Sequence, residues 1–260
     1  MKPSYFQDFV DSFSKTTSSD NEFLALAAGG SWIDGRMDRF SDIDLVVVHQ
    51  SQTLSLDQKK ALAESAGDLL ACFTGEHVGE PRLLICLYDN PMLHVDLKFV
   101  HFHDMTSRVE DPIIIWERNN VLTKLITQSV AEFPYPDFQW IEDRFWVWIH
   151  YAAAKIGRGE FFETTTFLSF IQQTVLGPLA LIKNKELPKG VRKIEMLLPE
   201  HDLELMKSTL ADQNTKSCLA ALRNAVYFYR TLRESVMPSS IKFNNRAEHA
   251  VMAYLSEIAN

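Results

Sequence analysis

The sequence predicts an α+β protein, with a mixed sheet in its N-terminal half and a helical bundle in its C-terminal half. Short apolar runs typical of strands occur only in the first half, and every long segment of the second half has helical periodicity. Between the halves stands AEFPYPD, residues 131–137, whose two prolines are typical of a linker. We therefore expect two domains, residues 1–130 and residues 131–260.

The first half begins with a helical pattern and continues through two strands and a second helix. Residues 4–14 space their apolar side chains as an amphipathic helix does, and the apolar run at 23–28 predicts a strand. Residues 45–48 are apolar and mostly β-branched, which favours a buried strand. Residues 57–73 predict a helix with an alanine- and leucine-rich apolar side.

A hairpin is expected next. Two strand-like runs at 83–87 and 93–100 flank the turn signal Tyr88-Asp89-Asn90-Pro91. The apolar patch at 113–126 fits either a helix or a strand. Helix, strand, helix and hairpin in this order indicate a sheet with an antiparallel part.

The second half predicts helices only. Their expected ranges are about 139–157, 163–184, 200–212, 214–235 and 243–259.

Composition and charge limit the function classes. The 260 residues carry a formal net charge of −8 at pH 7, which argues against broad nucleic-acid binding. The three cysteines, Cys72, Cys86 and Cys218, are widely spaced, so we expect reduced thiols in a cytoplasmic protein. We expect no signal peptide and no membrane span, because the N-terminus is acidic and no long apolar run occurs. The oligomeric state stays open.

Three aspartates predict a metal site. Asp42 and Asp44 point to one face because side chains two residues apart in a strand share a face. Asp96 lies on the polar face of an alternating strand, HVDLKFV. Neighbouring carboxylates repel each other unless a cation lies between them, and Mg²⁺ favours carboxylates together with phosphates. The alternative is a solvated acidic strand edge.

A glycine–serine loop precedes this pair. Gly29 and Gly30 allow a ligand to approach the backbone closely, and Ser31 adds a hydroxyl and an amide donor. The segment matches neither a P-loop nor a dinucleotide-binding fingerprint.

Together these elements resemble the DNA polymerase β-like nucleotidyltransferase superfamily: Gly29-Gly30-Ser31-Trp32, a spacer, Asp42-Ile43-Asp44-Leu45 and a later Asp96. The resemblance implies that Gly30 and Ser31 hold the nucleotide phosphates. It also implies that Asp42, Asp44 and Asp96 bind Mg²⁺ and act in catalysis. It makes ATP the expected nucleotide and a nucleotidyltransferase domain of residues 1–130.

One stripe of the first predicted helix of the second half combines cations and aromatic residues. Arg144, Trp148, Tyr151, Lys155 and Arg158 share this stripe, and a separate apolar stripe faces the core. Tyr151, Lys155 and Arg158 are candidates for nucleotide binding by phosphate neutralisation and base stacking. The alternative is a half-exposed helix whose long cations extend over aromatic rings.

The same helix resembles the opening helix of the C-terminal domain of aminoglycoside 6-adenylyltransferases, the streptomycin-modifying enzymes. The matching residues are Phe145-Trp146, Tyr151, Lys155 and Arg158-Gly159-Glu160. Two departures are Arg144, where that family has an acidic residue, and a lysine displaced by one position. The resemblance implies a helical domain for substrate or nucleotide, with the active cleft between the two domains.

The function expected from these motifs is Mg²⁺-dependent transfer of AMP from ATP to a hydroxyl of a small molecule, with an aminoglycoside-like acceptor as one candidate. Asp96, Glu142 or Asp143 is the candidate proton acceptor. Nucleotidylation of a protein or another acceptor, and a non-catalytic nucleotide-binding module, remain alternatives.

Two further questions stay open. Lys98 could pair with a triad carboxylate or contact phosphate, and Glu76 or Glu80 could line the acceptor pocket or belong to the loop surface. His94, His101 and His103 are expected at the strand surface.

Overall fold

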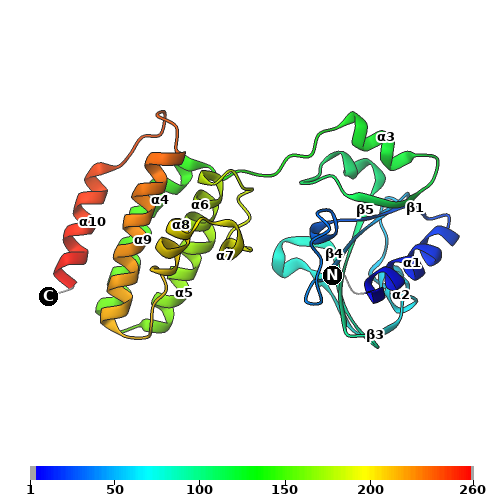
Figure 1. Ribbon diagram of the computed structural model, residues 1–260, viewed down its shortest axis with the longest axis horizontal. Coiled ribbons are helices and arrows are strands. Elements are labelled where there is room, and N and C mark those ends of the chain that lie inside the picture. The colour runs from blue at the N-terminus through cyan, green and yellow to red at the C-terminus, as the bar shows by residue number, and fades with distance from the viewer. Residues whose placement is uncertain (1–3, 259–260) are drawn as a thin grey trace. The chain divides into compact units, whose positions relative to one another are not determined.

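The computed structural model describes residues 4–258 and divides the chain into two compact units, Met1–Phe133 and Pro134–Asn260 (Figure 1). The first unit holds one six-stranded mixed sheet with three α-helices. In the second unit, the described residues form helices and loops without a strand. This is the α+β fold class predicted from the sequence.

The sheet of the first unit has the strand order β3-β4-β5-β2-β1-β6. Its strands are β1 (Phe23–Ala28), β2 (Ile43–His49), β3 (Asp68–Gly75), β4 (Glu80–Asp89), β5 (Leu93–His101) and β6 (Ile113–Glu117). β2 and β5 pair in parallel, and all other neighbours are antiparallel. The predicted hairpin is confirmed as β4 and β5.

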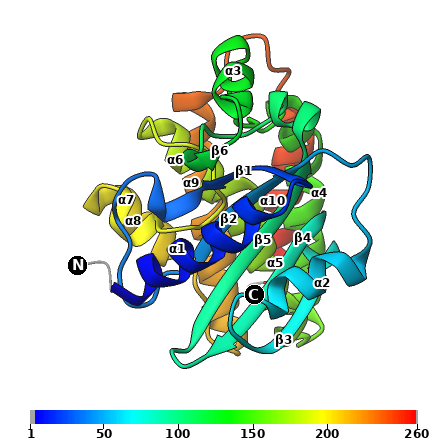
Figure 2. The same ribbon diagram turned by 90° about the vertical axis from the view of Figure 1, so that its right-hand side faces the viewer.

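Helices pack against both faces of this sheet. α1 (Ser4–Ser19) and α2 (Leu56–Glu64) cover one face (Figure 2). Phe13 and Ala63 belong there to the same buried cluster as strand residues such as Val95. α3 (Val121–Gln128) packs on the other face, where Leu122 joins Val100 and Val48 in a smaller cluster. α1 is five residues longer than the predicted range 4–14.

The helix predicted over 57–73 is wrong in its second half. α2 starts with a capping box between Ser55 and Gln58 and ends at Glu64, three residues before Gly67. The next residues form the edge strand β3, whose Cys72 pairs with Cys86 of β4. The apolar spacing suits a helix, but strand pairing gives this backbone hydrogen-bond partners at the edge of β4.

The ambiguous patch at 113–126 contains both a strand and a helix. β6 adds to the free edge of β1, and Asn119 and Asn120 then break the strand with positive φ angles of 52° and 54°. The Glu117 carboxylate accepts hydrogen bonds from the Leu122 and Thr123 amides at 2.9 Å each, which caps α3.

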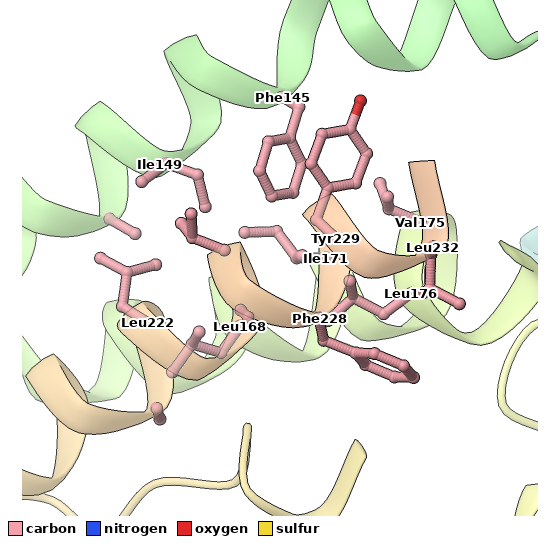
Figure 3. Packing of buried hydrophobic residues seen from close by; sticks show 14 of the residues in the cluster. Phe145, Ile149, Leu168, Ile171, Val175, Leu176, Leu222, Phe228, Tyr229 and Leu232 are labelled. Atoms are coloured by element: carbon pink, nitrogen blue, oxygen red, sulfur yellow. The ribbon is translucent and has the colours of Figure 1, made fainter. Parts of the chain in front are cut away.

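The second unit is an α-helical bundle, as expected. Its helices are α4 (Phe138–Gly157), α5 (Phe161–Ile171), α6 (Gly177–Lys183), α7 (Ile194–Leu197), α8 (Glu200–Lys207), α9 (Thr215–Val236) and α10 (Asn245–Ile258). Phe145 stacks on Tyr229 with ring centroids 3.6 Å apart, among buried aliphatic side chains from α4, α5 and α9 (Figure 3).

A π-helical turn at Gln172–Leu176 joins α5 to α6, so the predicted helix 163–184 contains a local irregularity. The combined stretch Phe161–Lys183 is the one helix in residues 4–258 that is long and apolar enough to cross a membrane. Half of its most apolar window is buried within the fold. A core helix of a globular protein has the same composition.

Candidate functional site

The three aspartates singled out in the sequence lie together on one face of the sheet. Asp44 of β2 and Asp96 of β5 are direct partners in the parallel register, and Asp42 stands two residues before Asp44. One carboxylate oxygen from each aspartate lies within 4.8 Å of the others. All three side chains are partly exposed.

Strand alternation explains this convergence. Ile43 and Val95, the residues between and beside the aspartates, are fully buried against the α1–α2 side. Successive side chains of a strand point to opposite faces, so Asp42, Asp44 and Asp96 point away from that core.

The glycine–serine loop passes directly beside Asp44. The Gly29 amide donates a 2.9 Å hydrogen bond to the Asp44 carbonyl oxygen, which ties the end of β1 to β2. Gly30 has a φ of +58°, and a methyl group at this position would lie 2.0 Å from Asp44 Oδ2. Only glycine therefore fits here while Asp44 keeps its position.

Ser31 contributes a buried hydroxyl that has no hydrogen-bond partner among the described residues. Buried polar atoms are normally satisfied, so this oxygen is available to a bound molecule. Three carboxylates are suitable ligands for Mg²⁺, and the absence of a side chain at Gly30 lets the Asp44 carboxylate lie directly against the loop. The residues present therefore fit a divalent metal together with a phosphate-bearing ligand.

Glu110 is a fourth carboxylate at this site that sequence reasoning missed. Its Oε1 accepts a 2.9 Å hydrogen bond from the Gly30 amide. The contact arises because β6 pairs antiparallel with β1 and Ile113 lies opposite Ala28, so the residues before Ile113 run beside Gly29 and Gly30. A strand at 113–117 would have indicated that Glu110 lies near this loop, but the sequence pattern there fitted either a helix or a strand.

The polar residues beside Asp96 form two separate contacts. His94 Nε2 lies 3.0 Å from Asp96 Oδ1. Lys98 Nζ lies 2.8 Å from Glu80 Oε2, so Lys98 pairs with a carboxylate outside the aspartate cluster. Arg82 also binds the Glu80 carboxylate, and its hydrogen bond, followed by that of Lys98, lowers the pKa of Glu80 to about 2.

His101 and His103 lie at the opposite end of β5 from Asp96. His101 pairs with His49 in the strand register, and its ring lies 5.3 Å from that of His103. Burial lowers the pKa of His49. These histidines are thus not part of the aspartate site.

In the helical unit, two glutamates form ion pairs and hydrogen bonds with the predicted stripe of cationic and aromatic residues on α4. Lys155 Nζ lies 2.7 Å from Glu160 Oε2 and 2.9 Å from Glu163 Oε2, and these hydrogen bonds raise the pKa of Lys155. The Tyr151 hydroxyl donates to Glu163. This hydrogen bond, followed by that of Lys155, lowers the pKa of Glu163 to about 2. Arg158 lies 3.5 Å from Glu160 and is mostly exposed.

At the start of the stripe, Arg144 lies over an aromatic ring. The Arg144 guanidinium lies 4.5 Å from the centre of the Trp140 ring and donates to the Trp140 carbonyl oxygen. Trp148 contacts the same ring edge-on at 5.4 Å. This part of α4 matches the alternative of cations lying over aromatic rings.

Glu142 is a buried structural acceptor. Only 1% of the residue is exposed. Its oxygens accept from Tyr229 Oη at 2.5 Å, Trp146 Nε1 at 3.1 Å and the Asn244 amide at 3.1 Å. A carboxylate enclosed in this way does not reach an acceptor hydroxyl, so its candidate role as proton acceptor is not retained. Asp143, the other candidate, is exposed and accepts from Gln139 at 2.8 Å.

Comparisons with known proteins give similarity to solved structures. No family model and no curated protein matches the chain. An aminoglycoside 6-adenyltransferase from Bacillus subtilis is similar over 97% of this chain and 98% of its own, with 13% identity and a TM-score of 0.44. A nucleotidyltransferase-like protein from Exiguobacterium sibiricum is similar over 95% of this chain and 79% of its own, with 15% identity and a TM-score of 0.38.

Proposed function

We propose that the chain is a Mg²⁺-dependent nucleotidyltransferase that moves AMP from ATP to a hydroxyl of a small molecule. One observation carries this proposal. The three aspartates and the glycine–serine loop, which stand apart in the sequence, meet at one point, where Gly30 is packed against Asp44.

Each group would have a distinct task. Asp42, Asp44 and Asp96 would hold Mg²⁺, which when bound polarises the α-phosphate and lowers the pKa of the acceptor hydroxyl. The Gly30 amide and the Ser31 hydroxyl would donate hydrogen bonds to phosphate oxygens and orient the triphosphate. Because Ser31 Oγ has no partner among the described residues, it can donate without first breaking a bond.

The chemical step is a displacement at the α-phosphorus. The acceptor oxygen forms a new bond to that phosphorus, the bond to the α–β bridging oxygen breaks, and pyrophosphate leaves. The hydroxyl proton passes to a carboxylate, and Asp96 is our candidate for this role because its side chain is partly exposed beside Asp44.

The helical unit would contribute through Tyr151, Lys155 and Arg158. We propose nucleotide contact for these residues, and any bound phosphate has to compete with Glu160 and Glu163 for them. An aminoglycoside-like polycation is a candidate acceptor, in keeping with the acidic net charge of the chain.

The test is transfer of label from α-labelled ATP in the presence of Mg²⁺ to a panel of aminoglycosides, other polyols, proteins and nucleic-acid ends. We expect labelled AMP on a small hydroxyl compound and stoichiometric pyrophosphate. Label on a protein or nucleic acid would support the alternative acceptor class. Mg²⁺-dependent ATP binding without pyrophosphate release would support a non-catalytic module.

A further inference from the structure

The Glu110 carboxylate accepts a hydrogen bond from the Gly30 amide, the donor that the proposed function assigns to a phosphate. The Gly30 N–H points to Glu110 Oε1 at 2.9 Å, and a methyl group at Gly29 would lie 3.3 Å from the same oxygen. The carboxylate therefore lies against both glycines of the loop, and Asp44 lies against Gly30 as well.

The segment that presents Glu110 is firmly anchored. Arg108, two residues earlier, has a side chain that is 6% exposed. It donates to Ser129 Oγ at 2.6 Å and to the Ile126 and Ser129 carbonyl oxygens at 3.2 and 2.9 Å. Its own carbonyl oxygen accepts from the Glu132 amide at 2.9 Å. The end of α3 thus fixes the backbone next to Glu110, and β6 fixes it on the other side.

An amide N–H has one proton to donate. A carboxylate oxygen and a phosphate oxygen are both anionic acceptors, and each makes a charge-assisted hydrogen bond with it. The two groups therefore compete for Gly30. In addition, Glu110 brings a fourth negative charge to a site that already holds three carboxylates, which opposes the approach of any anion.

We propose that Glu110 is a built-in competitor of the nucleotide phosphates and sets the affinity of the loop for triphosphate. A triphosphate binds Gly30 only after the Glu110 carboxylate has left it. Glu110 thereby weakens the binding of phosphate anions that arrive without a cation more than the binding of a nucleotide whose charge is offset by metal at the aspartates. This inference rests on the proposed function, because it needs phosphate at the glycine–serine loop.

The experiment is calorimetric titration of the full chain with α,β-methylene ATP, which resists cleavage at the α–β bridge, in the presence of Mg²⁺. The variants are Glu110→Ala, which removes the competing acceptor, and Glu110→Gln, which keeps an acceptor without the charge. Glu132→Gln is the matched control, because Glu132 is exposed and its backbone belongs to the same anchored region. Thermal unfolding verifies that each variant is folded.

We expect Glu110→Ala to bind the nucleotide roughly tenfold more tightly than the parent, with Glu110→Gln in between. Glu132→Gln should change the dissociation constant less than about twofold, because it removes charge without freeing Gly30. Equal or weaker binding by Glu110→Ala, with the parent binding normally, overturns the competitor role and leaves the proposed function intact. Absence of binding by the parent and every variant overturns the proposed function, and the inference with it.

Discussion

Gly30 approaches Asp44 so closely that a single methyl group on Gly30 would lie 2.0 Å from the Asp44 carboxylate. The loop and the carboxylate therefore form one structural unit. A change in one displaces the other, so the metal ligand and the phosphate donors that we propose are held close together.

Replacement of Gly30 by alanine should abolish Mg²⁺-dependent ATP binding. The new methyl group would displace the Asp44 carboxylate, and the positive φ of +58° would add strain of about 1 kcal/mol. Gly35→Ala is the matched control: its φ is +64°, but nothing lies within 4 Å of the added group. We expect both variants to lose similar stability and only Gly30→Ala to lose binding in calorimetry. Equal binding losses would mean that backbone strain, and not contact with Asp44, is responsible.

Replacement of Glu142 by glutamine should destabilise the helical unit by about 3 kcal/mol. The change weakens the bond from Tyr229 and removes the charge that lies 3.6 Å from Arg233. Urea unfolding of this variant beside Asp143→Asn, an exposed neighbour, measures the effect. Asp143→Asn should cost less than about 0.5 kcal/mol. A similar small cost for Glu142→Gln would contradict the structural role given to this carboxylate.

The ion pairs of Glu80 predict a pH-dependent contribution to stability. Arg82 and Lys98 lower the pKa of Glu80 to about 2 in the folded protein, from an ordinary value near 4.5. The contribution is therefore complete above about pH 5 and is lost as the pH falls from 4.5 towards 2. The free energy of unfolding of the parent should exceed that of Glu80→Gln by about 1 kcal/mol at pH 7. The difference is this small because the ion pairs are partly exposed to solvent. Urea midpoints should converge at pH 2.5, and a constant difference down to that pH would refute the assignment.

Replacement of Lys155 by methionine separates the two roles proposed for the α4 stripe. The loss of its pairs with Glu160 and Glu163 should cost little stability, because both glutamate side chains are partly exposed to solvent. If Lys155 also contacts the nucleotide, the dissociation constant for Mg²⁺–ATP should rise several-fold. Lys183→Met, which breaks the 2.7 Å pair with Asp202 in the same unit, should leave that constant unchanged. Unchanged affinity in both variants would make Lys155 a structural residue only.

The orientation of the three aspartates could be predicted from the sequence because it depends on local rules. The alternation of strands sends Asp42 and Asp44 to one face, and the alternating segment around Asp96 identifies a second strand. Their meeting depends on a parallel pairing of β2 with β5, which no local pattern encodes. The expectation that the three aspartates meet came from the resemblance of the sequence motifs to a known superfamily.

Other features depend on distant partners and were missed. β3 has an apolar spacing that fits a helix, and only the free edge of β4 selects the strand. Glu110 reaches Gly30 because β6 adds to the edge of β1, eighty residues away along the chain. The sequence around Glu142 did not indicate that this residue is buried, because its partners Tyr229 and Asn244 lie 87 and 102 residues further along the chain.

The most direct test of the account is ATP binding by Asp44→Asn, measured by calorimetry with and without Mg²⁺. Asp34→Asn is the control, because it removes the same charge from an exposed ion pair with Arg36 in the neighbouring loop. We predict that the parent and Asp34→Asn bind ATP only when Mg²⁺ is present. The Asp44→Asn variant should remain folded and lose at least about tenfold in affinity. A folded Asp44→Asn variant that binds Mg²⁺–ATP as tightly as the parent would contradict the central claim.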